Sequence, residues 1–174
     1  SRIEQKNNIT KMREKISDLE QNREDMEFIK VITEPWNEEE ELRQGLCMDN
    51  WHVLINIYTN VSEEMNILRE CTKRFWSDCD YVCFENKAVY GQYFVLFTVK
   101  EEQQAGTIIS QVPEFFSAMK IRNHSGKFYG AVSGKIQGIS QVHRAYQANE
   151  KMLRDIRLVD KVKFFYESEY SSQK

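Results

Sequence analysis

Apolar residues in the first 33 positions recur at steps of three and four, and the segment contains neither Gly nor Pro. A repeat near 3.5 residues places these side chains on one narrow stripe, which a lone helix cannot bury. The predicted a/d seam of a coiled coil consists of Ile9, Met12, Ile16, Leu19 and Met26, with Arg23 in the remaining a position. A weak parallel homodimer would bury this seam, and a helix folded back on its own domain is the alternative. Because a charged Arg23 weakens pairing, the seam predicts an adjustable contact and not an obligate dimer.

The helical pattern is interrupted at Pro35, since the residue before a proline is pushed out of the α region. Asn37 followed by Glu40 has the spacing of a capping box. This pair predicts a short helix within the segment 34–50, which would connect the long helix to the next unit.

The period of the apolar pattern changes after residue 50. The run 51–58 is rich in β-branched and aromatic residues and apolar at almost every position, which is typical of a central strand covered on both faces. Further strands are predicted at 81–84, 93–99, 127–138 and 162–166. Helical spacing predicts helices at 60–76, 101–119 and 141–158, with a kink or restart at Pro113 and an N-cap at Ser140. The second and third strands form a predicted hairpin that turns near Asn86.

The predicted order after the coiled-coil helix is β-α-β-β-α-β-α-β, and its centre is the βαββαβ unit of ferredoxin-like folds. This order predicts an α+β fold in which the helices cover one face of a mainly antiparallel sheet. The expected organisation is a coiled-coil signalling helix at 1–33, a connector at 34–50, the α+β domain at 51–170 and a tail at 171–174.

Charge is distributed unevenly along the 174 residues, although the net charge is only −3. Residues 120–174 carry 11 Lys and Arg against 5 Asp and Glu. Without an overall basic field, the chain does not have the composition of a nucleic-acid binder. An adaptor that meets an acidic partner through the basic third is one function to consider. No apolar run approaches the roughly 20 residues that cross a bilayer, so the prediction is a cytoplasmic protein with no membrane partner.

The four cysteines have no paired spacing, and Cys71 lies in the apolar stripe of a predicted helix. Reduced thiols within a core are the expected state. A metal site built from Cys79, Cys83 and either His52 or His124 is the alternative, but neither half has the tight spacing of a zinc site. The prediction is that the domain holds no metal.

The stretch 140–153 and the apolar strand that follows it, ending in Phe-Tyr-Glu, resemble a known signature. It closes the degenerate GGDEF-like middle domain of AraC-type (YesN-like) two-component response regulators. The matching residues are His143, Ala145, Tyr146, Ala148, Phe165, Tyr166 and Glu167. The resemblance also covers the strand at 130–134 and, more loosely, the long helix. The middle domain of PucR/CdaR-type regulators is the neighbouring possibility.

The resemblance implies partners as well as a fold. The domain would lie between a receiver and a DNA-binding module of the same polypeptide, and it would contact DNA only through that module. Its role would be to relay phosphorylation of the receiver, as a dimer, to the DNA-binding module.

The residues at the cyclase positions differ from those of active GGDEF domains. Diguanylate cyclases hold Mg²⁺ with carboxylates at the end of the first strand and in the hairpin. Here the first strand ends Ile55-Asn-Ile-Tyr-Thr-Asn60, and the hairpin reads Tyr90-Gly-Gln-Tyr-Phe94, both without an acid. No Gly-rich phosphate loop is present elsewhere. The sequence therefore predicts no catalytic residue and no cofactor, and a domain that is not an enzyme.

Two further expectations concern the environment of His143 and an alternative to the signal-relay function. His143 is expected to be a solvated surface histidine on the outer side of its helix. A small-molecule or nucleotide sensor that keeps a cyclase-like fold is the alternative function.

Overall fold

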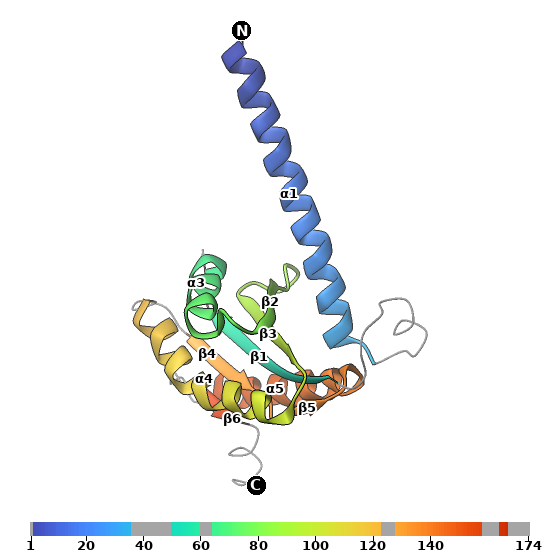
Figure 1. Ribbon diagram of the computed structural model, residues 1–174, viewed down its shortest axis with the longest axis vertical. Helices are drawn as coiled ribbons and strands as arrows, with labels where there is room; N and C mark the ends of the chain where they lie inside the picture. Colours follow the sequence, from blue (N-terminus) through green and yellow to red (C-terminus); the bar gives the residue numbers. More distant parts are fainter. Residues whose placement is uncertain (1, 36–49, 60–63, 123–127, 158–163, 167–174) are drawn as a thin grey trace.

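The computed structural model describes five stretches of the chain, residues 2–35, 50–59, 64–122, 128–157 and 164–166 (Figure 1). The predicted connector helix at 34–50 and the tail lie largely outside these stretches. The long first helix, α1, spans Arg2–Thr33 and projects from a domain built on one sheet (Figure 1).

The remaining elements follow the predicted order closely. The strands are β1 (Trp51–Thr59), β2 (Asp80–Glu85), β3 (Gln92–Val99), β4 (Phe128–Val132), β5 (Ile136–Gln137) and β6 (Phe164–Tyr166). The helices are α3 (Glu64–Trp76), α4 (Glu102–Arg122), the 3₁₀ turn η1 (Ile139–Gln141) and α5 (Val142–Arg157).

The sheet order is β2-β3-β1-β4-β6, and the short β5 pairs with the start of β1. All pairings are antiparallel except that of β4 with β6, which is parallel. The order β2-β3-β1-β4 with α3 and α4 as crossovers is the ferredoxin-like arrangement, so the α+β prediction with a mainly antiparallel sheet is confirmed.

Both faces of the sheet are covered, and the expectation that all helices lie on one face is wrong. Odd residues of β1, such as Val53 and Ile57, belong to the core beneath α3 and α4. Leu54, on the other side of β1, packs with Ile32 of α1 and Val142 of α5. Because β1 is apolar on both sides, leaving its second face open would expose buried side chains such as Leu54 to water.

Three local predictions also need correction. Pro113 lies inside α4, which continues through it as one helix, so the restart named as one of the two options does not occur. Ser140 is not a helix cap. It lies inside the 3₁₀ turn η1, whose N-cap is Gly138, and α5 begins only at Val142. The predicted strand at 127–138 is divided into β4 and β5 by residues 133–135.

Gly91 closes the β2–β3 hairpin against the end of β1. Its φ is +79°, and an added Cβ would collide with the backbone oxygen of Thr59. The Gly91 carbonyl also accepts a hydrogen bond from the Thr59 amide at 2.9 Å. Backbone of this kind is readily adopted by Gly and strained for other residues.

We expect Gly91→Ala to lower the free energy of unfolding by at least about 1–3 kcal/mol, through strain and the clash with Thr59. Gly106→Ala is the matched control, because its Cβ would meet only the flexible end of Lys135, at 3.2 Å. That change in a helix should be neutral or should stabilise the protein by up to about 1 kcal/mol. Urea unfolding measures both, and equal effects would contradict this account of the hairpin.

Candidate functional site

The predicted seam of α1 is uncovered in the single chain. Its apolar members are between 52% and 73% exposed, and they are Ile9, Met12, Ile16, Leu19 and Met26. Arg23 is exposed too, and its guanidinium lies 3.9 Å from the Glu27 carboxylate in the next turn. These residues share one side of the helix, so the stripe is available to a partner. The coiled coil itself stays a prediction.

The last turns of α1 are built into the domain through the opposite side of the helix. Ile32 is fully buried, and the Phe28 ring stacks on Phe84 of β2 with centroids 5.3 Å apart. Asp25 is buried, and its carboxylate accepts a hydrogen bond from the Glu85 amide at 3.5 Å. At 3.6 residues per turn, these docking positions fall on the side away from the seam. A second helix can therefore reach the seam without displacing the domain.

His143 joins α5 to the end of α1. Its Nδ1 lies 2.9 Å from the carbonyl oxygen of Ile32, and its ring is half-buried. The expectation of a solvated histidine is therefore wrong. A carbonyl in the last turn of a helix has no intrahelical partner. The Nδ1–H group of His143 supplies that partner from 111 residues away in the chain.

The other residues of the predicted family signature have mixed positions. Ala145 is buried beneath α5, Tyr146 is half-buried with its ring 6.0 Å from that of Phe94, and Ala148 is half-buried. In β6, Phe165 and Tyr166 pair with Ala131 and Val132 of β4. Glu167 lies outside the described residues. Ala145 and Tyr146 thus lie where α5 meets the sheet, and Phe165 and Tyr166 belong to a strand paired with β4.

A polar cluster lies beneath α5, where β1 ends and the hairpin begins. The Glu150 carboxylate accepts hydrogen bonds from Asn56 Nδ2 at 2.9 Å, Tyr58 OH at 3.0 Å and Gln92 Nε2 at 3.1 Å. Asn149 Nδ2 donates to Asn56 Oδ1 at 3.0 Å and extends the cluster inward. Three donors therefore converge on one half-buried carboxylate, an arrangement that fixes α5 against the sheet.

The two stretches expected at the cyclase positions do lie together, because Tyr58 pairs with Gln92 in the sheet. The side chains of Asn56 and Gln92 point to the face covered by α5, where they meet Glu150. The sequence reasoning missed this carboxylate. The only sequence signal for Glu150 was its place in the predicted amphipathic helix, directly after the buried residue Asn149.

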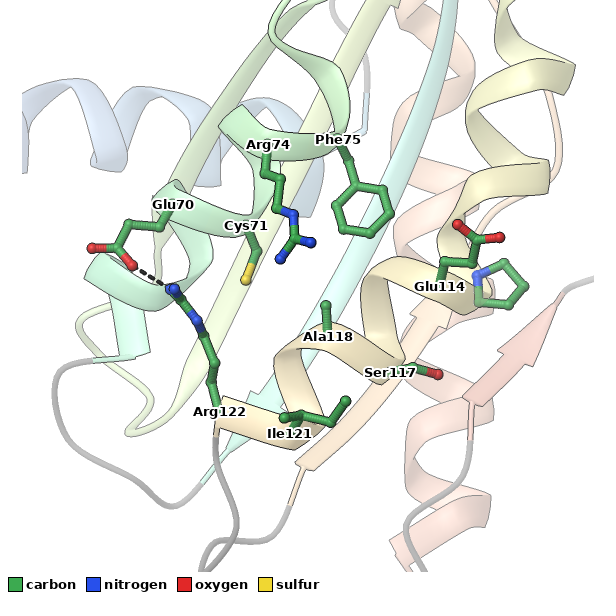
Figure 2. A pocket seen from close by; sticks show the side chains of 10 residues that line it. Glu70, Cys71, Arg74, Phe75, Glu114, Ser117, Ala118, Ile121 and Arg122 are labelled. Atoms are coloured by element: carbon green, nitrogen blue, oxygen red, sulfur yellow. Dashed lines mark hydrogen bonds and ion pairs between the residues drawn. The ribbon is translucent and has the colours of Figure 1, made fainter.

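A groove of about 520 Å³ lies between α3 and α4 on the other face of the molecule (Figure 2). Arg74 and Phe75 reach into it from α3, while Ser117 and Ala118 lie on the α4 side (Figure 2). An ion pair between Glu70 and Arg122 joins the two helices at one end (Figure 2). The mixture of opposite charges and apolar carbons selects no single ligand chemistry.

The described cysteines are free thiols. Cys71 is buried in the core as predicted, and Cys79 and Cys83 are half-buried. Burial raises the pKa of the Cys83 thiol, so the group is protonated at neutral pH. Among the residues that the structure describes, no three His, Cys, Asp or Glu side chains are grouped so that they could hold a metal ion. Cys47 and His124 lie outside them.

Comparisons with known proteins give one structural similarity. No family model matches the chain, and no curated protein matches it. It is similar to the structure of the active GGEEF domain of a diguanylate cyclase from Vibrio cholerae, with 9% identity and a TM-score of 0.47. The similarity covers 74% of this chain and 88% of that one.

This finding corrects one expectation from the sequence. The similar structure is an active cyclase domain, which contradicts the prediction that the chain is not an enzyme. That prediction is withdrawn. At 9% identity, the similarity assigns no activity to this chain. Within the described parts of the chain, no helix is both long and apolar enough to cross a membrane.

We expect Glu150→Ala to lower the free energy of unfolding by about 1–3 kcal/mol, because three donors lose their shared acceptor. Glu114→Ala is the matched control, since Glu114 is an exposed helical glutamate and should change stability by less than about 0.5 kcal/mol. Urea unfolding at neutral pH measures both. A Glu150→Ala variant as stable as the control would show that the cluster does not hold α5.

Proposed function

We propose that this chain is a dimerising, signal-transmitting domain of a two-component transcriptional regulator of the AraC type (YesN-like), acting in the cytoplasm. A receiver before α1 would change the pairing of two α1 helices when it is phosphorylated. The α+β domain would pass that change to a DNA-binding module that follows it. The sequence signature around His143 and the docking of α1 support this proposal.

The observation that carries the proposal is that α1 has an exposed apolar side and, in its last turns, an opposite side that packs on the domain. The seam is exposed over most of the helix, while Ile32 is fully buried in the domain core. A helix is stiff over this length, so a rotation imposed at the seam reaches the turns that contain Phe28 and Ile32. There it acts directly on β2 and on α5, through the Phe84 ring and His143.

The free energy of pairing two α1 helices is small enough for a signal to shift the pairing. Each apolar side chain buried in the seam contributes about 1.5–3 kcal/mol, while association costs several kcal/mol. Arg23 interrupts the seam and leaves few complete layers. The expected dissociation constant is roughly micromolar, so a modest signal shifts the pairing.

Ile16→Asp should abolish self-association, because it places a charge in the middle of the seam. The domain should stay folded, since Ile16 is 53% exposed. Ile3→Asp is the matched control: Ile3 is 73% exposed but lies outside the seam, and its replacement should leave the dimer intact. Sedimentation at several concentrations measures association. A persistent Ile16→Asp dimer would place association on another surface, and an unfolded variant would show that Ile16 packs on the domain.

Arg23→Leu should tighten the dimer about tenfold or more, because it adds one apolar layer to the seam. The lost ion pair with Glu27 is exposed and contributes little. Lys11→Leu removes the same charge at an exposed position off the seam and should change the dissociation constant by less than about threefold. Equal effects of the two substitutions would mean that the seam does not govern pairing.

A further inference from the structure

The seam of α1 allows two orientations of a second α1 helix, and Arg23 distinguishes between them. In a parallel pair, each a position meets its own copy, so Arg23 faces Arg23 of the partner helix inside the seam. Two like charges are then held together where both lose part of their hydration. In the single chain Arg23 is exposed and lies 3.9 Å from the Glu27 carboxylate, so this cost arises only on parallel pairing.

In an antiparallel pair, a positions meet d positions of the partner helix instead. The register that buries the whole seam has three kinds of layer, each formed twice: Ile9 with Met26, Met12 with Arg23, and Ile16 with Leu19. No layer then holds two arginines. The carbon chain of Arg23 can lie along Met12 of the partner helix while its guanidinium stays in water.

Charged residues flank the seam at the e positions of the heptads. They are Lys6, Arg13, Glu20 and Glu27, all exposed in the single chain. In an antiparallel pair, e positions of the two helices share one edge of the interface. The register above places Arg13 beside Glu20 of the partner helix. It also places Lys6 beside Glu27, and the twofold axis forms each pair twice. A parallel pair brings e positions next to g positions, and among the charged residues this pairs only Lys15 with Glu20.

We propose that two copies of this chain pair through antiparallel α1 helices, with their seams in contact and the e positions of each helix beside those of the other. Single exposed ion pairs contribute little to affinity. The orientation is set by the difference between the two arrangements. The antiparallel pair has four attractive contacts and no arginine layer, whereas the parallel pair has two attractive contacts and a layer of opposed arginines.

The antiparallel pair brings the first turns of one α1 beside the last turns of the other. There Phe28 and Ile32 hold the helix on its own domain, on the side away from the seam, so the partner helix does not displace the domain. This inference rests on the pairing of α1 helices in the proposed function. Under that function, a receiver that precedes α1 would lie beside the α+β domain of the partner copy, and the signal would pass between copies.

Two charge reversals on α1 separate the orientations. In the antiparallel pair, Arg13→Glu sets a carboxylate against Glu20 of the partner helix twice, and at low salt it should raise the dissociation constant about fivefold or more. Lys15→Glu is the matched control. It makes the same change in charge at an exposed position of the same helix, but it opposes Glu20 only in a parallel pair. Its effect should be less than about twofold. Sedimentation at several concentrations measures both, and an equal or larger effect of Lys15→Glu overturns the proposal.

The double exchange Arg13→Glu with Glu20→Arg restores opposite charges across the antiparallel pair. Its dissociation constant should return to within about twofold of that of the wild type. In a parallel pair the new arginine would face Lys15 and weaken association further. About 0.5 M NaCl should reduce the effect of Arg13→Glu alone, because exposed charges are screened. A double exchange that binds no better than Arg13→Glu overturns the proposal.

Cross-linking reports the orientation directly. Ile9→Cys chains are mixed with ¹⁵N-labelled Met26→Cys chains and oxidised, and the disulfides are identified by mass spectrometry. The wild-type chain, which keeps its own cysteines, gives the background. A disulfide between positions 9 and 26 is expected. Linkage of each position to its own copy overturns the antiparallel orientation but leaves dimerisation through α1 intact. A wild-type chain whose association is absent, or survives Ile16→Asp, overturns both this inference and the proposed function.

Discussion

The burial of β1 on both faces is the constraint on which the rest of the structure depends. Val53, Ile55 and Ile57 face one side and Leu54 the other, all without exposure to solvent. Two helices after the first and third strands are enough to cover one face. The second face needs α5, η1 and the last turns of α1. The last turns of α1 are therefore part of the domain core, although the rest of the helix extends from the domain. This arrangement couples the position of α1 to the packing of the core.

The same constraint explains the polar cluster under α5. Toward its C-terminal end, β1 carries Asn56 and Tyr58 on the side that α5 covers, where the packing would otherwise be apolar. Glu150 and Asn149 satisfy these groups, since a buried amide without partners would oppose docking of the helix. Apolar packing at Leu54 and hydrogen bonding at Asn56 thus hold neighbouring turns of α5 by different means.

Much of the fold was predictable, because hydrophobic periodicity reflects which residues must leave water. The long helix, the hairpin and the order of elements followed from spacing alone. The predicted fold placed the helices on one face of the sheet only. The apolar run of β1 nevertheless required that both faces be covered. The Glu150 carboxylate and the buried contact of His143 were missed for a common reason. Each residue is polar and lies at the edge of the buried side of α5. Its hydrogen-bond partner lies some 60 to 110 residues away in the chain. Spacing within one helix carries no information about such distant partners.

The bond from His143 to the Ile32 carbonyl has a consequence for biosynthesis. During translation, α1 leaves the ribosome before α5, which contacts its last turn. The carbonyl of Ile32 therefore has no contact with His143 until α5 has been synthesised and has docked on the sheet. Throughout that interval the nascent chain presents an apolar helix end beside the apolar seam. Under the proposed function, pairing of α1 helices from neighbouring nascent chains would precede closure of the domain.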